Sequence, residues 1–128
     1  MVADKHGDKR TLIVGATTNP SRYAFVAARM FSERGLDFVP IGIKKGTVFG
    51  KDILDLRSKP ELKDIDTITL YIGPSHQEEW IDYLIGLSPQ RIIFNPGTEN
   101  PEFFQQAQKA GIEVLPACNL VMLSTGQF

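Results

Sequence analysis

Residue types that carry chemistry are scarce in this chain of 128 residues. The single cysteine, Cys118, excludes an internal disulfide and suits a reducing compartment, so we expect the protein in the cytoplasm. The two histidines, His6 and His76, have no partner at metal-ligand spacing, and we therefore expect no metal site. A formal net charge of −1 gives no reason to expect nucleic acid as a partner.

Long apolar runs are also missing. None approaches the roughly 20 residues that a membrane helix needs, so we expect no membrane span. Residues 1–8 are polar and lack the apolar core of a secretory signal, and we interpret them as a flexible lead-in. The chain has the composition of a globular protein, and its length predicts one domain over residues 9–128.

Strand-like and helix-like segments alternate along this domain. The strand-like segments are 11–14, 38–43, 67–72, 91–94 and 112–115. The helix-like segments are 21–34, 74–87 and 101–110. Such alternation predicts an α/β fold with a mostly parallel five-stranded sheet covered on both faces. Two segments stay open: 53–56 is a further extended piece or a helical turn, and 116–128 is a covering turn or a short helix.

Sequence signals at three places predict where helices begin. Asn19 and Asn100 suit an N-cap, and each precedes a proline that suits the first helical position. Ser75 and Glu78 have the spacing of a capping box.

The first strand runs into a short turn with the sequence Gly15-Ala16-Thr17-Thr18-Asn19-Pro20. A strand, a glycine turn and a helix N-terminus together favour an anion, because backbone N–H groups and the helix dipole point at the ligand. We interpret the turn as a phosphate site. The full dinucleotide fingerprint has three glycines and this turn has one, so an ordinary βα turn without a ligand is the alternative.

Parallel sheets bind ligands beyond the carboxyl ends of their strands. Four turns are expected at this edge, and each combines glycine or proline with polar side chains: 15–21, 42–45, 73–76 and 95–98. Their shared position predicts one ligand site.

The end of the second strand bears on the identity of a nucleotide. An NAD site usually has an acid there, whereas this chain has Lys44 and Lys45 after Ile43. Lysine favours an additional phosphate, which NADP carries on its 2′ oxygen and coenzyme A on its 3′ oxygen. Arg22 adds a second positive charge near the phosphates. The sequence does not decide between the two lysines, and a solvated loop is the alternative.

Several motifs together resemble a known family. They are V-G-A-T-x-N-P-x-R at 14–22, V-P-I-G at 39–42, V-F-G at 48–50, N-P-G-T-E-N-P at 95–101 and A-C at 117–118. Over about residues 9–118 the chain resembles the small CoA-binding domain proteins, which are similar to the N-terminal domain of the succinyl-CoA synthetase α subunit. The resemblance implies a Rossmann-like three-layer fold. It also implies that residues 15–19 with Arg22 hold the diphosphate, that 41–44 hold the adenosine end, and that 72–75 lie along the pantetheine arm.

We therefore expect a stand-alone module that binds coenzyme A or an acyl-CoA, because we found no convincing catalytic set. The expected binding residues are Gly15, Ala16, Thr17, Thr18, Asn19, Pro20, Arg22, Gly42, Ile43, Lys44, Ile72, Gly73, Pro74, Ser75, Asn95, Pro96 and Gly97. The alternatives are an NADP-binding oxidoreductase-like domain and a protein-interaction module that docks through 120–123. A homodimer or a partner enzyme is left open. Cys118 is either a small buried residue or a contact for the thiol of coenzyme A.

Overall fold

The computed structural model describes residues 9–128, and the lead-in predicted over 1–8 lies outside the described residues. Six parallel strands form the central sheet in the order β5-β2-β1-β6-β7-β8. The strands are β1 (Arg10–Val14), β2 (Phe38–Gly42), β5 (Leu54–Asp55), β6 (Ile65–Leu70), β7 (Arg91–Phe94) and β8 (Glu113–Leu115). The predicted α/β fold with a parallel sheet is confirmed.

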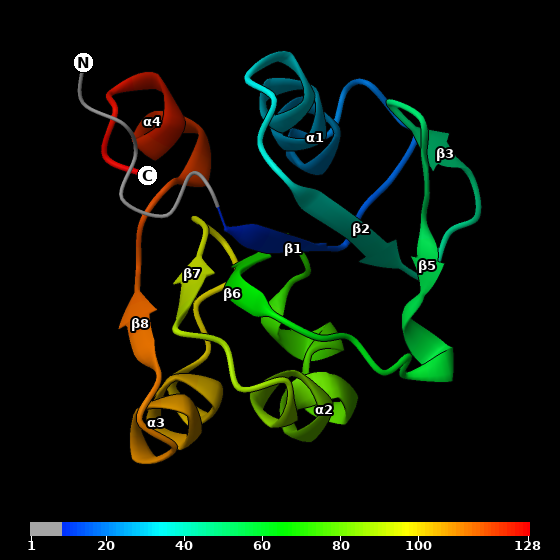
Figure 1. Ribbon diagram of the computed structural model, residues 1–128. Coiled ribbons are helices and arrows are strands. Elements are labelled where there is room, and N and C mark those ends of the chain that lie inside the picture. Colours follow the sequence, from blue (N-terminus) through cyan, green and yellow to red (C-terminus); the bar gives the residue numbers. More distant parts are fainter. Residues whose placement is uncertain (1–8) are drawn as a thin grey trace.

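Four helices cover the two faces of this sheet. They are α1 (Tyr23–Glu33), α2 (Ile81–Gly86), α3 (Pro101–Lys109) and α4 (Asn119–Ser124). Helices α1 and α4 lie on one face, and α2 and α3 lie on the other, which gives the three layers expected of a Rossmann-like fold (Figure 1). Among residues 9–128, no helix is long and apolar enough to cross a membrane.

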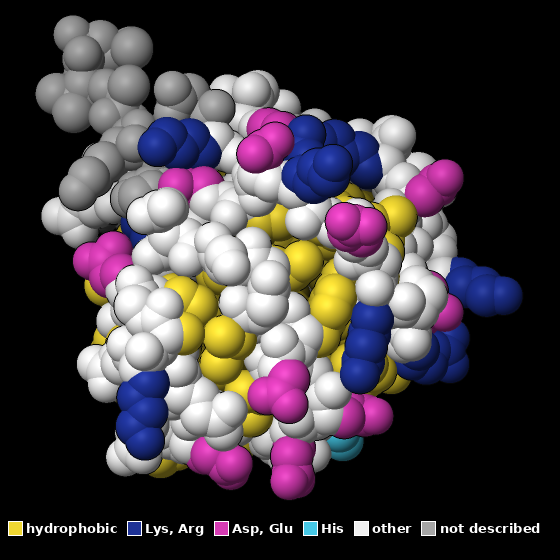
Figure 2. All heavy atoms as spheres, turned by 60° about the horizontal axis from the view of Figure 1, so that its bottom comes forward, with side chains coloured by type: hydrophobic (Ala, Val, Ile, Leu, Met, Phe, Trp, Pro, Cys, Tyr) yellow, Lys and Arg dark blue, Asp and Glu magenta, His cyan; other side chains and the backbone are white. Residues whose placement is uncertain are grey.

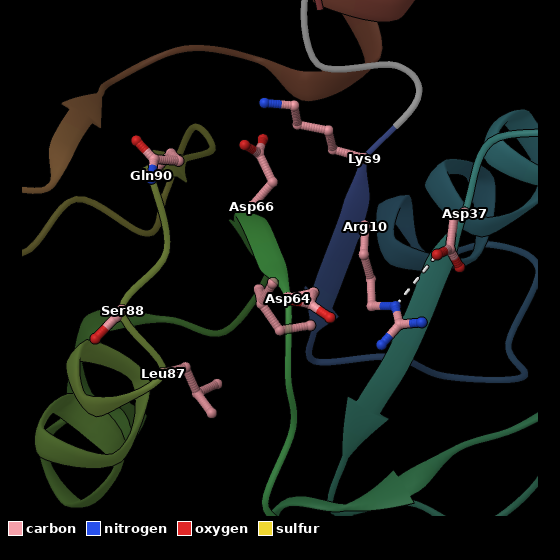
Figure 3. A pocket seen from close by; sticks show the side chains of 9 residues that line it. Lys9, Arg10, Asp37, Asp64, Asp66, Leu87, Ser88 and Gln90 are labelled. Atoms are coloured by element: carbon pink, nitrogen blue, oxygen red, sulfur yellow. Dashed lines mark hydrogen bonds and ion pairs between the residues drawn. The ribbon is translucent and has the colours of Figure 1, made fainter.

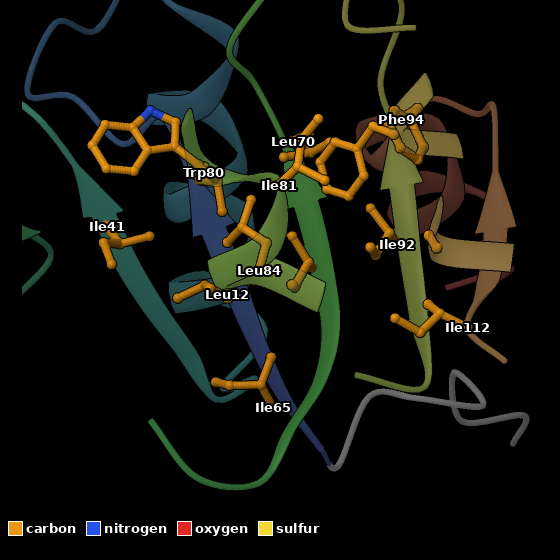
Figure 4. Close-up of a cluster of buried hydrophobic side chains, with 14 of the residues drawn as sticks. Leu12, Ile41, Ile65, Leu70, Trp80, Ile81, Leu84, Ile92, Phe94 and Ile112 are labelled. Atoms are coloured by element: carbon orange, nitrogen blue, oxygen red, sulfur yellow. The ribbon is translucent and has the colours of Figure 1, made fainter. Parts of the chain in front are cut away.

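Alternation along the strands fills both faces. Leu12 and Val14 of β1 pack in the cluster under α2 and α3, whereas Ile13 packs in the cluster under α1 and α4. This follows from the period of two in a strand, which sends neighbouring side chains to opposite faces. Figure 4 shows the first cluster, where Trp80 and Phe94 lie at the carboxyl-end side of the sheet.

The sheet has one strand more than the five expected. The segment 53–56, which the sequence left undecided, contributes to both a strand and a 3₁₀ turn: β5 pairs with β2, and a 3₁₀ turn at Leu56–Ser58 follows. Between β2 and β5, the short strands β3 (Thr47–Val48) and β4 (Lys51–Asp52) form an antiparallel hairpin.

Two predicted helix starts are wrong. Helix α1 begins at Tyr23, with Arg22 as a residue that makes no side-chain cap. The side chain of Asn19 instead accepts hydrogen bonds from the backbone N–H (3.0 Å) and the hydroxyl (2.8 Å) of Ser21. This local turn competes with the helix, as asparagine side chains commonly do, and Pro20 lies in the turn.

The segment after β6 also departs from the prediction. It forms two 3₁₀ turns, Pro74–His76 and Glu78–Trp80, before α2 begins at Ile81, and Ser75 makes no cap. The buried side chain of Gln77 binds backbone carbonyls outside this segment, which holds it away from a regular helix. By contrast the start of α3 is confirmed, because Asn100 accepts a hydrogen bond from the N–H of Phe103.

The segment 116–128 contains the short helix α4, one of the two alternatives. Its Leu123 is fully buried, and Leu120 and Met122 pack against the same cluster, so Val121 is the only largely exposed hydrophobic residue of α4. On the opposite side of the molecule, apolar side chains gather between charged ones on the face that α2 and α3 form (Figure 2). Half-buried apolar residues of these helices include Tyr83, Ile85 and Phe104.

Candidate ligand-binding site

A cavity of about 750 Å³ lies at the carboxyl edge of the sheet. Its lining comes from the turn after β1, the start of α1, the end of β2, the turns after β6 and β7, and Leu56, where the 3₁₀ turn after β5 begins. The predicted residues in the lining are Gly15, Ala16, Thr17, Asn19, Arg22, Gly42, Ile43, Lys44, Ile72, Gly73 and Pro96. The predicted residues outside it are Thr18, Pro20, Pro74, Ser75, Asn95 and Gly97. The structure therefore brings all four predicted turns to one cavity.

The cavity sits at the point where the order of the sheet reverses. Strand β1 has β2 on one side and β6 on the other. The helix after β1 covers one face of the sheet, and the helix after β6 covers the other (Figure 1). The connections diverge here, and this is where open α/β sheets bind their ligands.

Two glycines allow three backbone segments to meet in this place. Gly15 has a φ of +97°, and a Cβ there would lie 2.9 Å from Cγ2 of Ile72. A Cβ at Gly42 would lie 2.9 Å from the carbonyl oxygen of Ala16. The N–H groups of Gly15 and Ala16 both donate to the carbonyl of Ile41, at 2.9 and 3.0 Å. The turn after β1 is thus fastened to β2, and those two N–H groups are already used.

The start of α1 offers further backbone donors beside the turn. Arg22 makes no side-chain cap, and no hydrogen bond within residues 9–128 takes up the N–H groups of Tyr23 or Ala24. Both residues line the cavity. Uncapped N–H groups and the positive end of the helix dipole attract an anion. Helix α3 differs, because the side chain of Asn100 caps its first turn by accepting a hydrogen bond from the N–H of Phe103.

Positive side chains flank this helix end. Arg22 and Lys44 line the cavity, and neither forms an ion pair with another residue of 9–128. Lys45 is not part of the lining, so the structure separates the two lysines that the sequence left equivalent. A ligand with two separate phosphate groups fits two free cations on one rim.

The opposite wall contains residues that the expected set omits. Trp80 and Leu56, both buried, line it together with Ile72, while His76 and Glu79 lie exposed on its rim. In the sequence, Trp80 belongs to the apolar face of an expected helix. Such a face also occurs where a helix only packs on the core, so the pattern does not indicate a ligand contact. His76 lies in the turn 73–76 that topology predicted for this edge. Only the folded arrangement shows that these side chains face the cavity.

Asn95, expected near the ligand, is engaged by the protein. Its amide N–H₂ donates to the hydroxyl of Thr69 (2.8 Å) and the carbonyl of Leu70 (2.7 Å). Its amide oxygen accepts a hydrogen bond from the N–H of Asn119 at 2.8 Å. These bonds join the residue after β7 to β6 and to the start of α4. They thereby fix the position of the next residue, Pro96, in the cavity lining.

The residue after β6, Tyr71, belongs to the cavity lining, and its hydroxyl is buried. Burial raises the pKa of this phenol, and the nearby Thr69 hydroxyl offsets part of the rise.

Cys118 lies near enough to act on the Tyr71 pKa, is half-buried and is not part of the cavity lining. The thiol contact expected as an alternative has no direct opening to the cavity in this structure.

A second cavity, of about 550 Å³, lies at the amino edge of the sheet (Figure 3). Arg10 pairs there with Asp37 at 3.2 Å and also donates to the carbonyl of Lys63. Asp64 and Ser88 belong to the same lining. Within residues 9–128 no three metal-ligating side chains come together here or elsewhere. Because ligands of parallel sheets bind at the opposite edge, we take the carboxyl-edge cavity as the candidate site.

The fold and this edge define the class of Rossmann-like α/β proteins. Within that class the chain belongs to the CoA binding domain family, whose family model matches residues 9–124. The family resemblance expected from the motifs is thus confirmed.

Solved structures agree with this assignment. The chain is 47% identical to a protein described as uncharacterized, with a TM-score of 0.90, covering 94% of this chain and 98% of that one. It is 25% identical to cell-free ID.343 from Thermus thermophilus, with a TM-score of 0.80 and coverage of 93% and 90%. It is also 25% identical to a hypothetical protein from Pyrococcus horikoshii OT3, with a TM-score of 0.72 and coverage of 86% and 76%. No curated protein matches the chain.

Proposed function

We propose that the protein binds coenzyme A or an acyl-CoA at the carboxyl-edge cavity. The observation that carries this proposal is the uncapped start of α1: the N–H groups of Tyr23 and Ala24 have no partner within residues 9–128, and both residues line the cavity beside Arg22. Such a helix end suits a diphosphate, because each free N–H donates to an anionic oxygen. The membership in the CoA binding domain family supports the same ligand.

In this proposal Lys44 binds the 3′-phosphate. It follows Gly42 and Ile43 at the end of β2, where an NAD site would have an acid, and it lines the cavity while Lys45 does not. The adenosine end then lies on the β2 side, near the exposed Ile43. The two cations Arg22 and Lys44 support a ligand that carries a phosphate on its ribose in addition to a diphosphate.

The pantetheine arm would follow the wall at Ile72 and the turn after β7. Ile72, Leu56 and Trp80 make this wall apolar, and Thr98 and Pro96 line its far end. A volume of about 750 Å³ lies within the range of small-molecule sites.

The protein is proposed to bind without transforming its ligand. Within residues 9–128 the hydroxyls of Ser21 and Thr98 donate to the amide of Asn19 and the carbonyl of Asn95, and neither donates to a carboxylate or an imidazole. Neither hydroxyl is therefore activated by an adjacent base, which is a common arrangement in nucleophilic catalysis. A partner enzyme would supply the chemistry on a bound acyl group.

Calorimetric titration with coenzyme A, dephospho-CoA and NADP tests the proposal. We expect coenzyme A to bind about five times more tightly than dephospho-CoA, because an exposed lysine–phosphate contact contributes about 1 kcal/mol. The variant Lys44→Met removes this preference, and the matched control Lys45→Met keeps it.

Equal affinities for coenzyme A and dephospho-CoA would remove the role of Lys44. Tighter binding of NADP would replace the proposal by the oxidoreductase-like alternative. Binding of none of the three ligands would refute it.

A further inference from the structure

One buried amide connects two walls of the candidate site. Gln77 is fully buried, although Ser75, His76 and Glu78 around it are exposed. A polar side chain is seldom buried this completely unless its hydrogen bonds are made within the protein. The partners of Gln77 therefore indicate what its burial serves.

Both ends of the amide are used. The N–H₂ group donates to the carbonyl of Ile72 and to the carbonyl of Thr98, each at 2.8 Å. The amide oxygen accepts a hydrogen bond from the amide of Asn100 at 3.1 Å. Two carbonyl acceptors fix which end of the amide is the donor, so the orientation has one solution.

The two carbonyls belong to turns that follow different strands. Ile72 follows β6, Thr98 follows β7, and both residues line the cavity. Within the described part of the chain, the side-chain hydrogen bonds from the turn after β6 to the turn after β7 are those that Gln77 makes. Gln77 itself is not part of the lining, so it acts on the cavity through Ile72 and Thr98.

The nucleotide side of the cavity is held by other contacts. There the turn after β1 is fastened to β2 through the carbonyl of Ile41, and N–H groups without a partner among residues 9–128 lie at the start of α1. Within residues 9–128, none of the hydrogen bonds of the Gln77 side chain reaches that side. The two halves of the cavity thus depend on separate sets of hydrogen bonds.

We propose that Gln77 is a positioning residue for the arm half of the ligand, setting the distance between the turns along which the pantetheine arm lies. This inference rests on the proposed function and adds a division of the site. Affinity for the arm depends on the Gln77 amide, and affinity for the adenosine 3′,5′-bisphosphate half does not.

The test compares two ligands, coenzyme A and adenosine 3′,5′-bisphosphate, by calorimetry at a temperature where every variant is folded. Gln77→Met keeps the length of the side chain and removes both donors. We expect its dissociation constant for coenzyme A to rise at least about tenfold, and that for the bisphosphate to change less than about twofold. Gln105→Met, the same change at an exposed position of α3, is the matched control and leaves both constants unchanged.

A second variant guards against loss of the fold. Asn100→Asp keeps a good cap for α3 but loses the N–H₂ that donates to Gln77. It should show the same selective weakening, by about threefold.

A general distortion of the cavity would weaken both ligands together, so equal weakening of the two ligands overturns the inference, as does no weakening of either. Wild-type protein that binds the bisphosphate as tightly as coenzyme A also overturns it and leaves the nucleotide site standing. Wild-type protein that binds neither overturns the proposed function, and the inference with it.

Discussion

Replacing Gly42 by alanine tests the backbone contact on which the candidate site depends. The added methyl group would lie 2.9 Å from the carbonyl oxygen and 3.2 Å from the nitrogen of Ala16. Both are backbone atoms, and a side chain cannot rotate away to relieve the contact. The turn is also tied down, because Ala16 and Gly15 donate to the carbonyl of Ile41.

The cost follows from these contacts. Overpacking of a well-packed region costs about 1–3 kcal/mol. Replacing glycine by alanine restricts the unfolded chain and returns up to about 1 kcal/mol. We therefore expect Gly42→Ala to lower the free energy of unfolding by about 1–2 kcal/mol. For a chain of this size, that corresponds to a fall in Tm of about 3–12 °C.

Thermal unfolding followed by circular dichroism measures this effect. Gly86→Ala is the matched control, because Gly86 ends α2 with no atom within 4 Å of an added Cβ. Alanine there should leave Tm unchanged or raise it slightly, since glycine disfavours a helix. A Gly42→Ala protein as stable as the wild type would show that the turn after β1 and the end of β2 are not in close contact, and the geometry argued for the site would be wrong.

Two further changes test buried polar groups. Asn95→Leu should lower the free energy of unfolding by about 2–4 kcal/mol in urea titrations, because Leu70 and Asn119 lose a buried partner; a loss below about 1 kcal/mol would contradict its structural role. Tyr71→Phe should be close to neutral at pH 7, since the buried hydroxyl lacks a hydrogen-bond partner among the described residues. Burial raises the Tyr71 pKa above its ordinary 10.0, so above about pH 10 the unfolded chain loses this proton first and wild-type stability falls. The variant should lose less stability between pH 8 and 11, although Tyr83, whose pKa burial also raises, keeps part of the fall; equal losses in the two proteins would contradict the assignment.

The dipeptide Asn-Pro, which occurs twice, shows how much a local sequence pattern can predict. Asn-Pro occurs at 19–20 and at 100–101 and predicts a helix start at both places. At the second, Asn100 caps α3 through the N–H of Phe103. At the first, the Asn19 side chain binds Ser21, and α1 starts later, without a cap. A side chain with two nearby choices of partner cannot be assigned from the pattern alone, and here the difference creates the proposed anion site.

The hydrogen-bonding roles of two amide side chains, Asn95 and Gln77, also could not be predicted from the sequence. Asn95 was expected at the ligand because it lies in a polar turn at the carboxyl edge. It lies outside the cavity lining, and its amide instead joins β6, β7 and α4. Gln77 gave no signal, because its partners Ile72 and Thr98 are backbone carbonyls that any residue offers.

By itself the sequence determined the parallel α/β fold, the family and the turns that meet at the carboxyl edge. These follow from local information: the period of the apolar residues, the turn residues, and motifs that lie within a few positions of one another. Only the tertiary structure decided that Lys44 rather than Lys45 lines the cavity, that Trp80 closes its apolar wall, and that Gln77 joins two of its turns. These are distances between segments far apart in the chain, and they are set by how the strands pair and the helices pack, which no local pattern encodes.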